Sequence, residues 1–382
     1  MALLEINAAL FYTFFIGLFL VFAYCSRWRR YFQLGMKLPG PPALPIIGNG
    51  LQFTTNNLCK LFQEFKEIAR SYGPIARLWF GPVLIVVLTD PDCIESVVKH
   101  DKVVSRGTLI RKALEKVFRN GLVHTDGEEW RRHRKIVSAA LHINSLECFV
   151  ENFAKNSDIL ANNLKALADG ITAHDIAPYL MSCTLDIITQ TSCRVDLNAQ
   201  NGNEESTLNS IETVVHTTVV RLTKPWLLID WILSATELGK KYDKAVKFVH
   251  DKIIHGVEEI QRVRENGEKG SQTDEIPSLI DLLIQNADIT KKEIVGEMSS
   301  VLGGATKTAS TACGHVLAFL GDNQHIQERI MQEQQDIFGD DILRPVRSDD
   351  LPRMVYLEQV GNCLLRSPLL SRIEAIFLNY IK

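Results

Sequence analysis

A cysteine near the end of the printed sequence is the first residue that could do chemistry. Cys363 lies in the stretch LEQVGNCLLRSPLL, and Arg366 follows it three residues later. Because thiolates are soft metal ligands, Cys363 could bind a metal, or it could be an ordinary buried thiol. No two cysteines have the C-x-x-C spacing of zinc sites. Their scatter predicts reduced thiols in a body that faces the cytosol; they stand at positions 25, 59, 93, 148, 183, 193, 313 and 363.

A tryptophan and an arginine four residues apart are the second candidate. In DGEEWRRHRKIVSAALH, residues 126–142, Trp130 and Arg134 share one face of the expected helix. An indole N–H and a guanidinium on one face can both bind a carboxylate. In the alternative, which the spacing alone favours, Trp130 packs on the protein and Arg134 covers it as a cation–π pair. We expect Asp126 to cap this helix, Glu129 to stand at its third position, and the other basic side chains to form a solvated face: Arg131, Arg132 and Lys135.

A glycine pair followed by hydroxyl side chains is the third candidate. In EIVGEMSSVLGGATKTASTACGHVLAFL, residues 293–320, Gly303 and Gly304 each cost a helix about 1 kcal/mol relative to alanine. Small residues let another group approach a helix backbone closely, and hydroxyls can bend a helix by bonding back to its carbonyls. A flat ligand lying across one continuous helix would explain the pattern, and so would a break between two helices at the glycine pair. The hydroxyl residues are Thr306, Thr308, Ser310 and Thr311.

The elements that must position these residues are mostly helices. Apolar spacing predicts a helix over 58–72, and residues 75–89 predict two strands around a Gly81-Pro82 turn. Asp90 is placed to be the N-cap of the next helix, and residues 290–293 form a capping box. Amphipathic spacing predicts long helices at 128–142, 145–168, 177–193, 206–220 and 236–265, and the polar stretch 264–277 predicts a surface loop. The expected fold class is therefore mainly α with a small β part.

The first fifty residues predict a membrane anchor followed by a stiff connector. Ala8–Cys25 is apolar apart from hydroxyls and one glycine, and eighteen residues at about 1.5 Å each span roughly 27 Å. Basic residues follow at 27, 29, 30 and 37, so the positive-inside rule leaves the body in the cytoplasm. A cleaved signal peptide would carry its basic residues before the apolar run. The proline-rich stretch 38–50 predicts an extended, non-helical connector.

The bulk composition excludes one class of function. The 382 residues carry a formal net charge of −3, whereas a protein that coats nucleic acid is strongly basic. A hydrophobic share of 46% and a charged share of 23% are ordinary for a globular protein. We therefore expect no nucleic acid as a partner, and the apolar N-terminal run adds a membrane; a lipophilic small molecule as partner is implied only by the family resemblance described next.

Taken together, the segments resemble a microsomal cytochrome P450 of the family 4 type. The anchor, the proline hinge, the Trp-x-x-x-Arg helix and the glycine–threonine helix follow that family's order and spacing. The resemblance implies a cytochrome P450 fold that has an N-terminal transmembrane helix and is incomplete at the C-terminus. Further stretches similar to the family's C helix, E helix and K-helix approach lie at 120–142, 184–200 and 338–360. The implied parts are a membrane anchor at 1–30, a hinge at 31–50, a partial catalytic domain at 51–360 and a divergent tail at 361–382.

The resemblance also assigns roles to three residues. Trp130 and Arg134 match the C-helix residues that hold a haem propionate, and Thr308 matches the I-helix threonine that helps to deliver protons during oxygen activation. It implies haem iron as cofactor, electrons from NADPH through NADPH-cytochrome P450 reductase, and location in the endoplasmic reticulum membrane. No residue is assigned as a metal ligand.

Three positions depart from the family's pattern. Lys307 stands where the family has an acid beside its threonine, although a one-residue gap would place Thr306 and Lys307 at the acid and threonine positions. Gly304 stands where many family 4 members have a glutamate that esterifies haem, so no such link is expected. Cys363 replaces the glutamate of Glu-x-x-Arg, and no cysteine occupies the haem-loop frame Phe-x-x-Gly-x-x-x-Cys-x-Gly.

The resemblance implies a haem-thiolate monooxygenase that hydroxylates lipophilic substrates such as fatty acids. The missing frame predicts that the chain is C-terminally truncated and inactive as printed. The alternative is a non-catalytic, membrane-anchored protein that binds lipophiles or the reductase. A product of gene-model or transcript processing is the third interpretation.

Overall fold

The computed structural model describes most of the chain in two compact units. The described residues are 12, 16, 19, 29–44, 47–53, 58–100, 107–141, 143–202, 204–265, 277–341 and 343–366. The units comprise Met1–Val103 and Val104–Lys382. The fourfold division into anchor, hinge, catalytic domain and tail stays a prediction.

The first unit is built on one hairpin. Strands β1 (Ile75–Phe80) and β2 (Val83–Leu88) pair antiparallel, from Ile75 opposite Leu88 to Phe80 opposite Val83. The two-residue turn requires Gly81, whose φ of 58° is left-handed. This confirms the predicted strands and turn. Flanking helices are α2 (Leu58–Tyr72) and α3 (Pro91–Val98), and the Asp90 carboxylate caps α3 by accepting from the Cys93 N–H, as expected.

Aromatic side chains fill the core of the first unit. Phe53 stacks on Phe65 and on Phe80, with ring centroids 4.8 and 5.3 Å apart. Trp79 stacks on Phe32 at 4.8 Å. Such pairs contribute about 0.5–1.5 kcal/mol each beyond the area they bury, so the hairpin is held largely by ring contacts.

The predicted anchor, Ala8–Cys25, lies outside the described residues except for three single positions. Among the residues that the structure describes, no helix has the length and apolar character needed to cross a bilayer. The proline-rich connector is non-helical at residues 38–44 and 47–49, in agreement with its composition.

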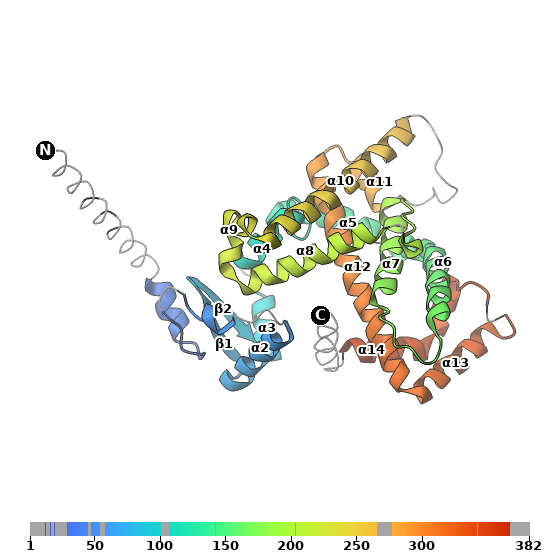
Figure 1. Ribbon diagram of the computed structural model, residues 1–382, viewed down its shortest axis with the longest axis horizontal. Coiled ribbons are helices and arrows are strands. Elements are labelled where there is room, and N and C mark those ends of the chain that lie inside the picture. The colour runs from blue at the N-terminus through green and yellow to red at the C-terminus, as the bar shows by residue number, and fades with distance from the viewer. Residues whose placement is uncertain are drawn as a thin grey trace. The chain divides into compact units, whose positions relative to one another are not determined.

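The second unit is helical throughout its described ranges (Figure 1). Its helices are α4 (Thr108–Phe118), α5 (Gly127–Ala140), α6 (Ile143–Leu167), α7 (Ala177–Ile188), α8 (Glu205–Thr223), α9 (Asp230–Ala235), α10 (Glu237–Glu265), α11 (Leu279–Gln285), α12 (Lys291–Asp322), α13 (Gln324–Phe338) and α14 (Val355–Arg366). The predicted long helices are confirmed within a few residues at their ends. Most of the predicted loop 264–277 lies outside the described residues.

Helix α12 is the central element of this unit, with α7 packed along it (Figure 1). The Thr184 hydroxyl on α7 donates to the Thr306 carbonyl at 3.0 Å. The reciprocal capping box of Thr290 and Glu293 opens α12, as predicted. The helix runs unbroken through Gly303 and Gly304, so the alternative of two helices is wrong. Burial of α12 against its neighbours offsets the cost of the two glycines.

Helix α7 ends earlier than the sequence predicts. The expected helix over 177–193 is α-helical only to Ile188, and Thr189–Cys193 form a π turn. The hydroxyls of Thr189 and Thr191 donate to the carbonyls of Leu185 and Ile187, at 2.9 and 2.7 Å. These bonds compete with the regular helical ladder and widen the last turn.

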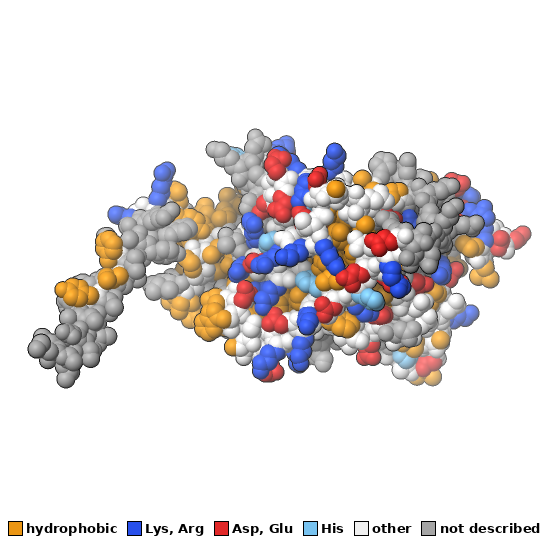
Figure 2. All heavy atoms as spheres, turned by 90° about the horizontal axis from the view of Figure 1, so that it is seen from above, with side chains coloured by type: hydrophobic (Ala, Val, Ile, Leu, Met, Phe, Trp, Pro, Cys, Tyr) orange, Lys and Arg blue, Asp and Glu red, His pale blue; other side chains and the backbone are white. Residues whose placement is uncertain are grey.

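Acidic and basic side chains are interspersed on the face of the molecule that Figure 2 shows. The face carries no large area of one sign, which agrees with the net charge of −3.

Candidate functional site: the junction of α5 and α12

Helix α5 presents two different faces. Its inner face carries His133, Val137 and Ala140, which are buried. Trp130 and Arg134 lie on the flank, roughly 80° around the helix from His133 at 100° per residue. Arg134 is exposed and Trp130 is 38% exposed.

The exposed flank excludes the cation–π interpretation of Trp130 and Arg134. No cation–π contact joins the two, and no hydrogen bond or ion pair joins the Arg134 guanidinium to another described residue. Both side chains are therefore accessible from solvent, and their types are ones that can bind a carboxylate.

The predicted cap of α5 is wrong in its detail. Asp126 is the N-cap residue, but its carboxylate makes no capping bond. It pairs instead with the Arg111 guanidinium of α4 at 3.2 Å. A charged partner on a neighbouring helix competes with the backbone N–H groups for the same carboxylate oxygens.

A buried polar cluster fixes α5 to α12. His133 Nδ1 bonds the Glu297 carboxylate, and both side chains have no exposed area. His133 Nε2 lies 3.3 Å from Glu293 Oε1, and the Arg132 guanidinium also bonds Glu293. Arg132 further donates to the Asp288 carbonyl at 2.6 Å, so it is no part of a purely solvated face.

The cluster shifts the proton affinities of its members. Burial lowers the pKa of His133, but the hydrogen bond and charge of Glu297 and the hydrogen bond of Glu293 outweigh it, so the pKa is raised. Burial alone would raise the pKa of Glu293. Hydrogen bonds from Thr290 and the charge of Arg132 have the larger effect and lower the pKa to about 2. Glu293 is therefore a carboxylate at neutral pH.

Three side chains in this cluster are close enough together to act as metal ligands. A ligand atom from each of Glu129, His133 and Glu293 lies within 4.8 Å of the others. The Arg132 guanidinium, 3.2 Å from His133 Nε2 and bonded to Glu293, already supplies a positive charge there. We therefore assign the cluster a structural role.

The face of α12 that meets α5 continues as an open surface. Glu297, Gly304 and Thr308 fall within roughly 40° of each other around the helix axis. Glu297 is buried, whereas Gly304 and Thr308 are exposed, and a Cβ built on Gly304 meets no atom within 4 Å. The Thr308 hydroxyl donates to the Gly304 carbonyl at 2.6 Å, which leaves its oxygen as an acceptor on the open side.

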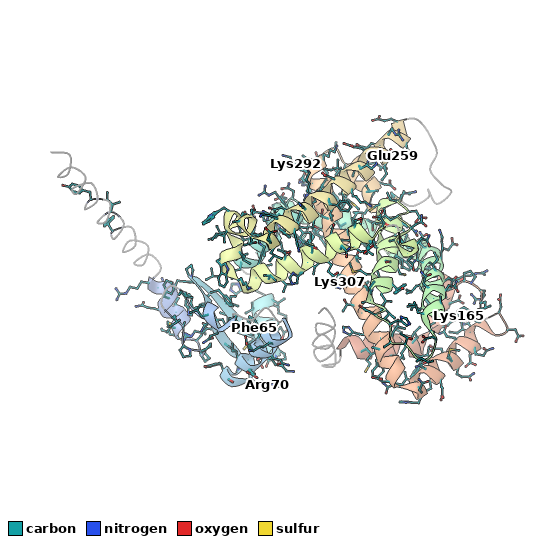
Figure 3. All side chains as sticks on the ribbon, in the orientation of Figure 1. Phe65, Arg70, Lys165, Glu259, Lys292 and Lys307 are labelled. Carbon is teal, nitrogen blue, oxygen red and sulfur yellow. The ribbon has the colours of Figure 1, made fainter. Side chains whose placement is uncertain are left out.

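The three predicted site residues are not in mutual contact, but their helices are joined. The hydrogen bond between His133 and Glu297 joins α5 to α12. Glu297 precedes Thr308 by eleven residues, which is about 16 Å along the axis of α12. Lys307 lies midway along α12, half-buried beside Thr308 (Figure 3). No carboxylate is bonded to the Thr308 hydroxyl among the described residues.

These residues fit the distal part of a haem site. Trp130 and Arg134 are accessible side chains of types that could hold a propionate, and the open space at Gly304 would let a flat group approach α12. Cys313 of α12 lies near Cys183 of α7, and Cys363 is exposed on α14.

Sequence reasoning missed the residues that hold the junction. His133 and Glu297 were not singled out, and Glu293 was expected only as part of a capping box; His133 lies 160 or more positions from both glutamates. A local signal did exist. His133 occupies the core-facing position of an otherwise apolar stripe with Val137 and Ala140, and the two glutamates follow each other at i, i+4.

Comparison with known proteins agrees with this geometry. The family model for cytochrome P450 matches residues 38–370. Cytochrome P450 4d2 of Drosophila melanogaster is 29% identical over 87% of this chain and 69% of its own length. Cytochrome P450 4c3 of the same organism is 27% identical over 91% and 68%, and cytochrome P450 4V2 of Mus musculus is 27% identical over 93% and 69%. The chain therefore belongs to the cytochrome P450 family, with family 4 members as its relatives.

Proposed function

We propose that this chain is part of a monooxygenase that hydroxylates lipophilic substrates such as fatty acids. The observation that carries the proposal is the open face of α12 at Gly304 and Thr308, on the same face of α12 that contacts α5 at Glu297. When bound, haem supplies the activation of dioxygen, with electrons from NADPH delivered by NADPH-cytochrome P450 reductase.

The side chains of α5 would hold the cofactor by its acidic edge. The Arg134 guanidinium and the Trp130 indole N–H would donate to one propionate. Charge-assisted bonds of this kind are about twice as strong as neutral ones. Thr308 would hold a proton donor or water with its hydroxyl oxygen. Lys307 cannot take the place of a carboxylate as a proton acceptor while it is charged, so we expect a weak proton relay.

Titration with haem tests this assignment through binding rather than activity. Arg134→Ala should weaken haem binding about tenfold, because one charge-assisted contact is lost. Arg131→Ala is the matched control, since Arg131 is on the same helix, exposed, and paired with Glu128. Equal affinities of the Arg134→Ala variant and the wild-type chain would remove the propionate site from the proposal.

We further propose that these 382 residues do not supply the axial thiolate. No cysteine stands in the family's haem-loop frame, and Cys363 stands at the position of the K-helix glutamate. The chain as printed should bind haem without the reduced, carbon monoxide-bound absorbance typical of thiolate ligation. That absorbance, measured on this chain alone, would show that one of the eight cysteines is the ligand.

The alternative of a non-catalytic lipophile- or reductase-binding protein makes a different prediction. Residues 31–382 would then melt cooperatively as a monomer without haem. A haem-dependent fold would melt cooperatively only after haem is added.

The proposed location is the endoplasmic reticulum membrane, with the body facing the cytoplasm. The proposal rests on the apolar run Ala8–Cys25 and the basic residues that follow it. Protease added outside sealed microsomes should digest the body. Full protection of the body from the protease would show that it lies inside the microsomes, which is the opposite orientation.

A further inference from the structure

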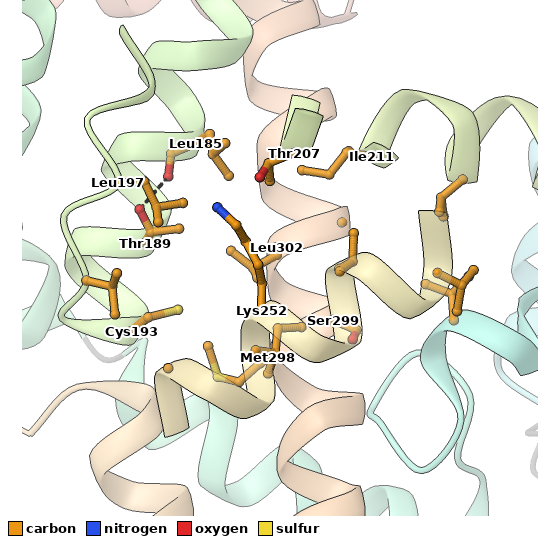
Figure 4. A pocket seen from close by; sticks show the side chains of 18 of the residues that line it. Leu185, Thr189, Cys193, Leu197, Thr207, Ile211, Lys252, Met298, Ser299 and Leu302 are labelled. Carbon is orange, nitrogen blue, oxygen red and sulfur yellow. Dashed lines mark hydrogen bonds between the residues drawn. The ribbon is translucent and has the colours of Figure 1, made fainter. Parts of the chain in front are cut away.

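An apolar cavity of about 110 Å³ lies on the opposite side of α12 from the open face (Figure 4). Its walls come mainly from α7, α8, α10 and α12, with further side chains from α4, α11 and the π turn after α7. At 100° per residue, the cavity side of α12 points roughly 180° away from Gly304 and Thr308. The cavity is therefore separate from the proposed haem face. The α12 residues that line it are Met298, Ser299, Leu302 and Gly303.

The walls of the cavity are almost wholly aliphatic. Leu185, Ile211 and Ile253 contribute from three helices. At one end Lys252 reaches between Thr189 and Thr207 (Figure 4). Its ammonium pairs with the Glu204 carboxylate, which also accepts from the Thr207 hydroxyl. Because this charge is already neutralised, the cavity favours an uncharged ligand over an acid.

One polar group in the wall has no partner. Ser299 is 2% exposed, and its hydroxyl makes no hydrogen bond with any described residue. The adjacent Ser300 behaves differently, since its hydroxyl donates to the Gly296 carbonyl at 2.7 Å. A buried hydroxyl without a partner costs free energy that a ligand could recover.

We propose that this cavity binds a small neutral molecule with one apolar ring and one hydroxyl, of the phenol class. The ring would fill the aliphatic space, and its hydroxyl would bond Ser299 Oγ. An apolar cavity of about 150 Å³ binds benzene, and this one is smaller, at about 110 Å³, so it limits the ligand to a single ring. A bound ligand would contact α7, α8, α10 and α12 at once, and would thereby stabilise the side of α12 that faces away from Thr308.

The test compares phenol with benzene on the full chain in detergent. Thermal unfolding, followed by circular dichroism at rising ligand concentration, gives the dissociation constants. Phenol should bind about fivefold more tightly than benzene, because it adds one hydrogen bond in a buried site. Ser299→Ala should abolish that preference while benzene still binds.

Two further variants separate the site from general effects. Ser300→Ala removes a hydroxyl of the same size next in the chain, and it should leave the preference for phenol unchanged. Val249→Phe fills the cavity from α10 and should abolish binding of both probes, while partition into detergent stays the same. The measurement uses the chain with or without haem, whichever state of the wild-type chain unfolds cooperatively. The proposal is overturned by either of two results: no ligand-dependent shift in that state, or equal losses of the phenol preference in Ser299→Ala and Ser300→Ala.

Discussion

Two parts of one face of α12 have opposite environments. Around Glu297 the face is closed by α5, and its carboxylate is fully buried against His133. Seven residues later the same face is open at Gly304, and Thr308 beyond it is exposed. The side chains alone do not explain this difference, because a glutamate would be expected in water and a glycine could lie anywhere. The presence or absence of a neighbouring helix decides it.

The closed part should dominate the stability of the second unit. Glu297→Ala leaves the buried His133 without its main partner, and breaking a buried pair costs about 3–5 kcal/mol. Urea unfolding followed by circular dichroism measures this loss.

Thr308→Ala is the matched control on the open part of the same face. Its hydroxyl bonds only its own helix, so the change in unfolding free energy should stay within about 0.5 kcal/mol. Similar losses for both variants would mean that the two parts do not differ.

Gly296→Ala tests how tightly the closed region is packed. A Cβ there would lie 2.3 Å from the Arg119 carbonyl oxygen and 2.7 Å from the Gly121 nitrogen, both backbone atoms. Because backbone cannot rotate away, overpacking should cost about 1–3 kcal/mol despite alanine's better helix propensity. The midpoint of urea unfolding should therefore fall. A stabilised variant would show that the segment containing Arg119 and Gly121 does not contact α12.

The pH dependence of stability should report on His133. Its pKa is raised in the folded state, so its contribution is complete below the unfolded value of about 6.5 and is lost as pH rises through the folded pKa. The unfolding free energy should therefore decrease from about pH 6.5 upward. The effect should be smaller than that of Glu297→Ala, since only one proton is exchanged. His133→Gln should flatten this part of the profile, and an unchanged profile would assign the titration to another group.

Local signals in the sequence predicted much of the fold. The hairpin turn at Gly81-Pro82, the Asp90 cap and the capping box at Thr290 each depend on residues within four positions, and each is present. The ranges of the long helices follow from apolar periodicity, which is also local. Type and spacing singled out Trp130, Arg134 and Thr308, but their roles come from the resemblance to the family and stay predictions.

Long-range contacts explain what the sequence could not predict. Asp126 has the right type for a cap, but Arg111, fifteen residues away, binds its carboxylate instead. His133 and Glu297 are 164 positions apart, and nothing in the local pattern of either predicts that they meet. The same applies to the glycines of α12: Gly296 lies against backbone and Gly304 against open space, although both occur among small residues.

Gly304→Ala should give the smallest effect on stability, and with the opposite sign. No atom lies within 4 Å of the added Cβ, so the gain in helix propensity should stabilise the haem-free chain by about 0.5–1 kcal/mol. If the open face receives haem, the same methyl group should weaken haem binding, because it occupies the space through which a flat group approaches the backbone. Urea unfolding and haem titration on the same variant measure the two effects separately. If Gly304→Ala is more stable and binds haem as tightly as the wild-type chain, the face is open as described but haem does not bind there.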